Sequence, residues 1–361
     1  MTRIVIVGGG LAAAALVGSL RRRGFAGAVT VLCAESLPPY DRPPLSKELF
    51  SRDAPAWLSD EFALADDAAT WVLGTRAAAL VPGGVADSTC RVWEADEVVL
   101  AMGVAPRASW AGTHTLHTWD DATALRRAFE GAQSAAIVGA GWLGLELASV
   151  ARSRGIATTL IDATAGPLGA LLPHAVSARI GEWVTASGAT FVGGATVLHA
   201  GPTHATTTNG ALAADCVAVT LGSAPQTAWL PPELLAPTGH VRADGDGRVR
   251  ARLWAIGDCA ALEGGAHPHW NDAIASAERC AAAIVGDELP RPHVPHGFST
   301  LFGHDVQMLG TPRPALAVEF AETPTGWTAH MMHDGALTAV LAVDSPREVA
   351  KARKALAILA R

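Results

Sequence analysis

The chain has 361 residues, 50% of them hydrophobic and 17% charged, which excludes a disordered protein and is enough for two or three folded domains. Its 27 Lys and Arg against 34 Asp and Glu give a net charge of −7, which argues against a global nucleic-acid binder. Only three of the basic residues are lysines, namely Lys47, Lys351 and Lys354.

The five cysteines lie far apart, and none forms a Cys-x-x-Cys pair. We therefore expect reduced, mostly buried thiols, and neither a paired-cysteine zinc site nor a dithiol relay. The best apolar run, at residues 11–20, is too short to span a membrane, and no targeting segment precedes the first strand. These features predict a cytoplasmic protein.

The first 35 residues have the pattern of a dinucleotide-binding module. The expected strand, helix and strand occupy residues 3–7, 11–23 and 28–32. Gly8, Gly10 and Ala13 make a G-x-G-x-x-A turn, which lets the backbone approach a pyrophosphate at a helix amino terminus. Glu35 follows the second strand, where a carboxylate accepts hydrogen bonds from a ribose. The alternative is an ordinary glycine-rich turn.

The same pattern recurs in the middle of the chain. A strand at 134–138, a helix reaching about residue 154 and a strand at 157–161 surround Gly139, Gly141 and Gly144, and Asp162 follows. Each module is also followed by a similar third-strand segment, which ends at Gly103 in the first copy and at Gly222 in the second. Two modules predict two dinucleotides, and such an enzyme is most simply a flavoprotein reduced by a nicotinamide.

Acidic residues indicate which cofactor each module holds. No Arg or Lys lies between Asp162 and His174, so the second module should accept a ribose 2′-hydroxyl and prefer NADH over NADPH. The first module would then hold FAD. A strand at 252–256 leads into Gly257 and Asp258, and we expect this carboxylate at a strand-to-helix junction to accept a hydrogen bond from the ribityl chain. An aspartate that only caps its own helix is the alternative.

Five motifs together resemble the FAD-dependent, NADH-linked ferredoxin reductases, and their order covers about residues 1–290. They are Gly8-x-Gly10 with Glu35, the string Pro39-Tyr-Asp-Arg-Pro-Pro-Leu-Ser-Lys47, Val98-Val-Leu-Ala-x-Gly103-x-x-Pro-Arg107, Gly139-x-Gly141-x-x-Gly144-x-Glu146, and Ala255-Ile-Gly-Asp258. The resemblance implies a glutathione-reductase-like α/β fold with two Rossmann-like dinucleotide-binding domains and a small α+β carboxy-terminal domain. The FAD-binding domain would comprise residues 1–106 and 225–291, the NAD-binding domain 107–224, and the flavin-covering domain 292–361.

The resemblance also assigns roles to side chains. It places Arg42 at the FAD phosphates, Lys47 near flavin N5, Glu146 on the nicotinamide side and Asp258 at the ribityl chain. Physical chemistry supports Lys47, because a compact ammonium stabilises the negative charge that a hydride brings to the ring. Glu146 lies one turn into its helix and is expected to pair with Lys47, whereas a solvated or capping carboxylate is the alternative. Further expected cofactor contacts are Pro44, Arg107, Trp142, Trp270 and Phe298.

Three of these expectations are ambiguous in the sequence. Trp142 occupies the place of an aromatic gate over the flavin, and core packing is equally consistent with it. Trp270 has the same alternative. The family's Trp-Ser-x-Gln motif here reads Phe298-Ser-Thr-Leu301, which keeps an aromatic side chain but loses the glutamine. Two histidine pairs, at 267/269 and 293/296, lack carboxylate or cysteine partners, so we expect no metal.

With no cysteine pair, electrons should leave the flavin directly. The resemblance predicts a [2Fe-2S] ferredoxin of an oxygenase system as the acceptor. Basic residues of a terminal helix could dock such an acidic partner, or could merely complement the helix dipole, and the same ambiguity holds for arginines at 21–23 and 126–127. The helix residues are Arg347, Lys351, Arg353, Lys354 and Arg361. The alternatives are an NADH oxidase or small-molecule tailoring enzyme, and a non-enzymatic NADH-sensing flavoprotein.

Overall fold

The computed structural model describes residues 2–107, 109–262, 265, 269–291 and 293–359. The chain forms two compact units. The first consists of Met1–Asp41, Pro55–Ala105 and Ala224–His293, and the second of Arg42–Ala54, Pro106–Ser223 and Val294–Arg361. The second unit thus contains both the predicted NAD-binding segment and the carboxy-terminal segment, and the three-domain division stays a prediction.

A six-stranded sheet organises the first unit. Its strands are β1 (Arg3–Val7), β2 (Ala28–Leu32), β5 (Thr70–Val72), β9 (Glu97–Leu100), β20 (Arg248–Arg250) and β21 (Leu253–Ala255). Their order is β20-β21-β9-β1-β2-β5, with β1 parallel to both β2 and β9. The apolar run of β1 is buried in four of its five positions, as expected for a central parallel strand.

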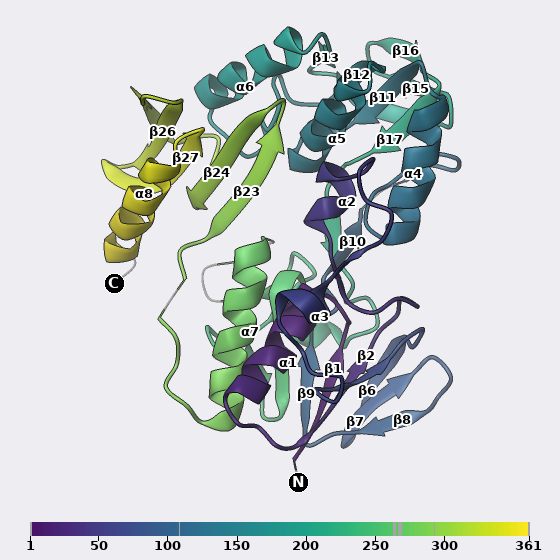
Figure 1. Cartoon of the computed structure of the whole chain (residues 1–361), viewed down its shortest axis with the longest axis vertical. Coiled ribbons are helices and arrows are strands. Elements are labelled where there is room, and N and C mark those ends of the chain that lie inside the picture. Colours follow the sequence, from purple (N-terminus) through teal and green to yellow (C-terminus); the bar gives the residue numbers. More distant parts are fainter. Residues whose placement is uncertain (1, 108, 263–264, 266–268, 292, 360–361) are drawn as a thin grey trace. The chain divides into compact units, whose positions relative to one another are not determined.

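Two helices pack together against this sheet, α1 (Leu11–Arg22) and α7 (Trp270–Val285). Figure 1 shows them side by side in front of β1 and β9. Small alanines on α1 are fully buried and allow the close approach, and α7 contributes Ala277, Cys280 and Ala281 to the same core. After α1 the chain turns at Gly24, whose φ is +77°, so the first module has the strand–helix–strand order predicted from its sequence.

Shorter elements complete the first unit. They are β3 (Tyr40–Asp41), β4 (Ala56–Trp57), α3 (Leu58–Glu61), β6 (Ala77–Val81), β7 (Gly84–Asp87), β8 (Val92–Glu94), the 3-10 helices η1 (Pro232–Leu234) and η2 (Gly257–Cys259), β19 (Val241–Arg242) and β22 (Ala260–Ala261). β6, β7 and β8 form a separate antiparallel sheet. Two short strands, β10 (Val104–Pro106) and β18 (Ser223–Pro225), pair where the chain passes from one unit to the other.

The second unit contains a four-stranded sheet with the order β13-β12-β11-β17 and parallel pairing throughout. Its strands are β11 (Ser134–Val138), β12 (Ala157–Ile161), β13 (Thr190–Val192) and β17 (Cys216–Val219). The accompanying helices are α4 (Trp119–Gly131), α5 (Trp142–Ser153) and α6 (His174–Ala186). This sheet repeats the β1–β2–β9 arrangement of the first unit, so the predicted duplication is confirmed.

Two smaller pieces belong to the same unit. The five-residue helix α2 (Pro43–Lys47) carries the lysine of the specific string and packs on α5. An antiparallel sheet consists of β14 (Val197–Gly201), β15 (His204–Thr207) and β16 (Gly210–Ala213).

The carboxy-terminal part of this unit is a five-stranded antiparallel sheet with the order β23-β24-β27-β26-β25. Its strands are β23 (His296–Leu301), β24 (His304–Gly310), β25 (Ala317–Glu322), β26 (Trp327–His333) and β27 (Ala336–Val343), and the helix α8 (Pro346–Leu359) follows. Ala352 and Leu356 of α8 are buried against Leu309 and Val340 of the sheet. Figure 1 shows α8 lying along β24 and β27.

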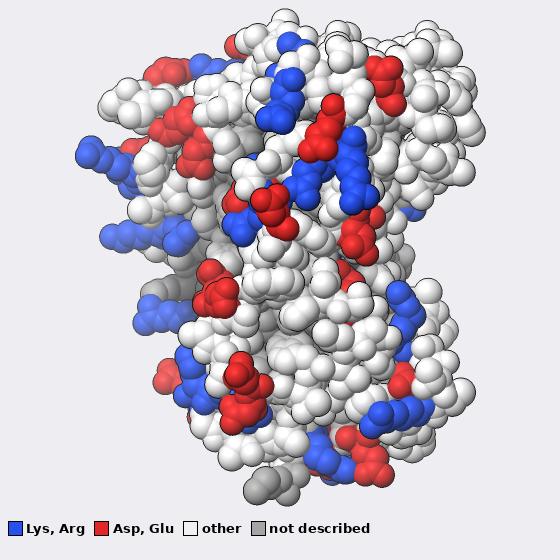
Figure 2. Space-filling model, turned by 45° about the vertical axis from the view of Figure 1, so that its right-hand side comes forward, with Lys and Arg blue, Asp and Glu red and all other residues white. Residues whose placement is uncertain are grey.

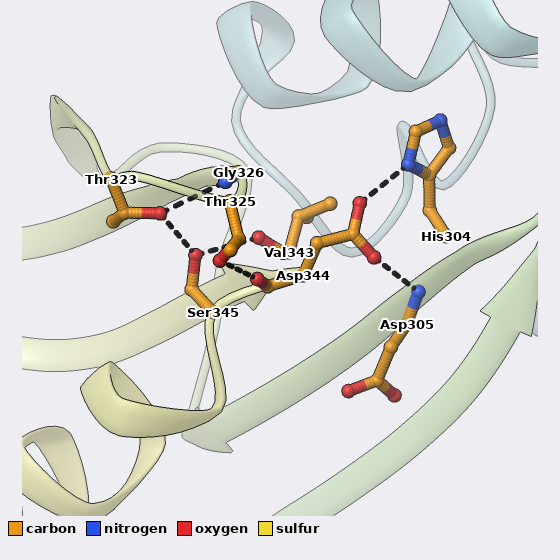
Figure 3. A network of polar contacts seen from close by, with 8 residues as sticks. All are labelled: His304, Asp305, Thr323, Thr325, Gly326, Val343, Asp344 and Ser345. Carbon is orange, nitrogen blue, oxygen red and sulfur yellow. Dashed lines mark hydrogen bonds and ion pairs between the residues drawn. The ribbon is translucent and has the colours of Figure 1, made fainter.

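Polar contacts fix the corner between β27 and α8 (Figure 3). Asp344 has a φ of +49° and accepts hydrogen bonds from the ring of His304 (2.7 Å) and the backbone N–H of Asp305 (2.8 Å). The buried Ser345 donates to the carbonyl of Val343 at 2.8 Å. The ring of His304 also stacks on Trp183 of α6, with 4.4 Å between centroids. This stacking joins the carboxy-terminal sheet to α6.

Candidate functional site

The glycine turn of the first unit leaves room for a phosphate. Gly8 has a φ of +108°, and a Cβ there would lie 2.3 Å from the backbone oxygen of Ala101. A Cβ at Gly10, the N-cap of α1, would meet nothing within 4 Å. The first position thus requires glycine for backbone packing, whereas the second leaves open space at a helix amino terminus. Both properties fit the pyrophosphate of a dinucleotide.

Other expected contacts of the first unit surround this turn. Glu35 follows β2, and Tyr40 donates a hydrogen bond to its carboxylate. Gly103 follows β9 with a φ of +65°, a left-handed conformation that favours glycine. Ala13 is fully buried in α1, so its small side chain serves helix packing.

Asp258 lies where a strand leads into a helix, as expected, but the helix is a short 3-10 helix. The strand before it ends at Ala255, but Asp258 is the middle residue of the 3-10 helix η2, and β22 follows directly. The long helix α7 begins only at Trp270, so the helix at this junction is the single turn of η2. A Cβ at Gly257 would lie 2.8 Å from the Cβ of Ala12, which places η2 against the start of α1. Asp258 is thus beside the glycine turn, and its ribityl contact stays a prediction.

Trp270 is the first residue of α7. Its indole Nε1 donates to Asp41 Oδ1 at 2.8 Å, so the side chain is hydrogen-bonded within the first unit rather than serving only as apolar filler.

The second glycine turn follows the same rules. Gly139 has a φ of +103°, and its Cβ would lie 2.6 Å from the oxygen of Thr220. A Cβ at Gly144 would lie 2.0 Å from the oxygen of Gly139, whereas one at Gly141 would meet nothing within 4 Å. Trp142 begins α5, and its indole Nε1 is buried without a hydrogen-bond partner among the described residues. A free donor beside an open turn fits a polar dinucleotide.

Asp162 holds the turn in place. Its Oδ2 accepts from the N–H of Ala140 at 2.7 Å, and its Oδ1 accepts from the N–H of Thr164 at 2.8 Å and from the hydroxyl of Thr164 at 2.6 Å. A carboxylate has about four acceptor positions, so these bonds leave capacity for a ribose hydroxyl. The ribose contact stays a prediction, and the turn contact is an additional function of this residue that the sequence did not indicate.

The predicted pairing of Lys47 with Glu146 is confirmed. Lys47 Nζ lies 2.6 Å from Glu146 Oε1, and the glutamate is only 7% exposed, so the solvated or capping alternative is wrong. Ser46 Oγ donates to Glu146 Oε2 at 2.5 Å, and Ser299 Oγ donates to Oε1 at 2.5 Å. The sequence analysis missed both serines. Ser46 belongs to the motif at residues 39–47, and Ser299 belongs to the altered Phe298–Leu301 motif. Their places in these motifs were the sequence signal that could have identified them as site residues.

The remaining expected contacts of the second unit have identifiable surroundings. Arg42 is the N-cap of α2 and donates to the carbonyl of His117, next to Pro44 in the first turn. Arg107 donates to the carbonyls of Gly222 and Ser223, through its backbone and side chain respectively. Phe298 is 41% exposed on β23, and its ring centroid lies 5.8 Å from Lys47 Nζ. Their contacts with FAD or NADH stay predictions.

Several charged or metal-type clusters have structural partners. Arg21 donates to backbone carbonyls, Arg23 pairs with Asp287 at 2.9 Å, and Arg126 donates to a backbone carbonyl. These arginines of the 21–23 and 126–127 runs therefore make contacts within the protein itself. His293 lies 3.6 Å from Asp272, so the expectation that this histidine lacks a carboxylate partner is wrong. Within the described residues no cluster of three potential metal ligands occurs. His267 and Arg361 of the sequence analysis lie outside the described residues.

All five cysteines are described and are free thiols, four of them buried and Cys90 exposed. Burial raises the pKa of the Cys33 thiol to about 12. Among the described helices, none combines the length and the hydropathy that crossing a membrane requires.

The family model described as "Pyridine nucleotide-disulphide oxidoreductase" matches residues 2–279. The chain is similar to the rhodocoxin reductase of Rhodococcus erythropolis, with 30% identity over 98% of this chain and 89% of that protein. It is also similar to the biphenyl dioxygenase system ferredoxin–NAD(+) reductase component of Paraburkholderia xenovorans, with 28% identity over 97% and 92% of the two chains.

Among solved structures, Fdr9 shares 32% identity with a TM-score of 0.89 and covers 99% of this chain and 95% of its own. The reductase in the covalent putidaredoxin reductase–putidaredoxin complex matches in fold, with 23% identity, a TM-score of 0.90 and coverage of 98% and 92%. These likenesses confirm the α/β fold with two dinucleotide-binding modules that the sequence predicted.

Proposed function

This chain belongs to the pyridine nucleotide-disulphide oxidoreductase family, and we propose that within it the protein is an NADH-dependent flavoprotein reductase that delivers electrons to a ferredoxin. The similar protein named as a ferredoxin–NAD(+) reductase component, which the match covers over 92% of its length, supports this acceptor. The observation that carries the proposal is the combination of two open glycine turns with a buried Lys47–Glu146 pair. Free thiols are typical of reducing compartments, which supports a cytoplasmic location.

FAD and NADH are the cofactors. When bound, FAD supplies the chemistry that accepts a hydride from NADH and releases electrons one at a time. The turn at Gly8 and Gly10 would hold the FAD pyrophosphate, with Glu35 at its ribose. The turn at Gly139 and Gly141 would hold that of NADH.

Lys47 and Glu146 set the charge for the reaction. We place the ammonium of Lys47 at the flavin, where it offsets negative charge that develops on reduction. Its partner Glu146 is buried and keeps the side chain in one orientation. No cysteine pair is present to relay electrons, so the acceptor must receive them directly.

We further propose that α8 docks the ferredoxin. Figure 2 shows Lys and Arg interspersed with Asp and Glu over the visible face, so charge complementarity has to be local. Arg347, Lys351 and Lys354 are exposed at i, i+4 and i+7 of α8, and of these Lys351 pairs with Glu348 at 2.7 Å. A basic stripe of this kind suits an acidic partner and raises its association rate.

Anaerobic stopped-flow spectroscopy tests the proposal. Mixing with NADH should bleach the flavin rapidly, and turnover should begin only when a [2Fe-2S] ferredoxin is added. Rapid peroxide formation in air without ferredoxin would instead establish an oxidase. Slow bleaching with a stable long-wavelength band would indicate an NADH sensor.

The docking surface has its own test. Changing Arg347, Lys351 and Lys354 to glutamate should raise the KM for ferredoxin at least about tenfold at low salt, while bleaching by NADH stays unchanged. A KM that remains at the wild-type value would place the docking surface elsewhere.

A further inference from the structure

Three hydrogen-bond donors converge on one buried carboxylate in the second unit. Lys47 Nζ (2.6 Å) and Ser299 Oγ (2.5 Å) both contact Oε1 of Glu146. Ser46 Oγ contacts Oε2 at 2.5 Å. A buried ionised carboxylate requires such partners, because its desolvation is otherwise costly. The three donors account for most of the hydrogen-bonding capacity of this side chain.

The donors come from segments far apart in the sequence. Ser46 and Lys47 are adjacent on α2, whereas Ser299 lies on β23 of the carboxy-terminal sheet, 153 positions after Glu146. The residue directly after β23 also contacts α5, because the backbone N–H of Phe302 donates to Ser149 Oγ at 2.9 Å. Phe298, next to Ser299, presents its ring to the ammonium of Lys47. β23 therefore contacts both members of the ion pair.

The position of Ser299 is unusual for a hydroxyl. Along β23 the buried positions alternate with exposed ones from Gly297 to Leu301, and Ser299 is 2% exposed on the inward face. A side chain at such a position is ordinarily apolar, and an unbonded hydroxyl there destabilises the fold. A serine is therefore favourable at this inward position only because its hydroxyl bonds to Glu146.

We propose that Ser299 is a positioning residue for the Lys47–Glu146 pair. Its hydroxyl fixes the orientation of Glu146 and shares the negative charge of Oε1, so that the carboxylate does not fully cancel the field of the ammonium bonded to the same oxygen. In this way a strand of the carboxy-terminal sheet controls the charge that Lys47 presents. This inference rests on the proposed function, in which that charge favours flavin reduction.

The variant Ser299→Ala tests the inference without any ferredoxin. Under anaerobic conditions we expect the limiting rate of flavin reduction by NADH to fall about tenfold, with little change in the NADH concentration at half-maximal rate. Since Glu146 then cancels more of the ammonium's field, we also expect the reduction potential of the bound flavin, measured by equilibration with a redox dye, to become more negative. Ser299→Thr keeps the hydroxyl and should restore both values.

A matched control is available at the corner that follows the last strand of the same sheet. Ser345 is also buried, at 4% exposure, and bonds only within the carboxy-terminal corner drawn in Figure 3. Ser345→Ala removes a buried hydroxyl beside the same sheet and should leave both the reduction rate and the potential at wild-type values. If both alanine variants lowered the rate equally, the effect would come from general loosening of the sheet, and the inference would be overturned.

A double-mutant comparison with Glu146 distinguishes a positioning role of Ser299 from a role in packing. In a Glu146→Gln background the amide has no charge to share, so adding Ser299→Ala should change the rate and the potential by less than about twofold. Should Ser299→Ala fail to fold, Ser299→Cys offers a weak donor of similar shape for the same measurements. Equal effects in both backgrounds would refute the coupling. A wild-type flavin that NADH cannot reduce would instead overturn the proposed function, and the inference with it.

Discussion

Replacing Lys47 by methionine should separate the stability of the site from its chemistry. The change keeps the length and apolar stem of the side chain but leaves the carboxylate of Glu146, 7% exposed, with two hydroxyl donors and no positive charge. Breaking a buried ion pair by removing one partner costs about 3–5 kcal/mol. Because the Lys47 side chain is 22% exposed and both serines remain, we expect the lower end, about 3 kcal/mol in the free energy of unfolding.

The double variant Lys47→Met with Glu146→Gln supplies the decisive comparison. It removes the unpaired negative charge of Glu146, while the glutamine amide oxygen still accepts a hydrogen bond from Ser46 or Ser299. We therefore expect about 2 kcal/mol of the lost stability to be regained. Flavin reduction by NADH should nevertheless stay about 10–100-fold slower than in the wild type, because the ammonium is absent in both variants.

Urea unfolding of the apoprotein and anaerobic stopped flow measure the two quantities. Lys351→Met is the control, since Lys351 also pairs with a glutamate (2.7 Å) but is 73% exposed, and we expect a change below about 0.5 kcal/mol. The reasoning fails if Lys47→Met is no more destabilising than this control, or if the double variant is less stable than the single one.

Three further predictions concern the rest of the chain. Gly8→Ala should cost more than about 2 kcal/mol in urea unfolding, because a Cβ would lie 2.3 Å from a backbone oxygen, whereas Gly10→Ala should keep stability and lower flavin content. At pH 8, Cys90 should react with iodoacetamide within minutes while Cys33, whose pKa burial raises to about 12, stays unlabelled by mass spectrometry. Burial also lowers the pKa of His296 from 6.5, so the unfolded chain binds its proton first as pH falls. Native stability should therefore be full above pH 6.5 and decrease below it, and a thermal melt of His296→Gln should lack this component.

The dinucleotide modules could be predicted from sequence because every feature that defines them is local. Buried strands read as apolar runs, and the glycines stand where the backbone has no room for a Cβ or where a helix begins. The pairing of Lys47 with Glu146 joins two segments 99 positions apart, and it was accessible only because both residues belonged to recognised motifs.

The errors arise where a distant segment determines the local structure. Residues 252–260 read as a strand entering a helix, but this helix ends after one 3-10 turn, and β22, which pairs with the distant β19, follows directly. Ser299 was missed for a related reason. A serine in a β-strand has no local sequence signature. The proposed role of Ser299 depends on its bond to Glu146, which lies on the helix α5, distant in the sequence.

The choice of lysine at position 47, in a chain with only three lysines, has a physical explanation in the site. Lys47 ends a helix of five residues and places one ammonium against Glu146 Oε1, the same oxygen that Ser299 contacts. A planar guanidinium would take both carboxylate oxygens in a bidentate pair and compete with the two serine hydroxyls. A compact charge with three donors can share one oxygen and leave the other to Ser46. The network as a whole, rather than the charge alone, therefore selects lysine at this position.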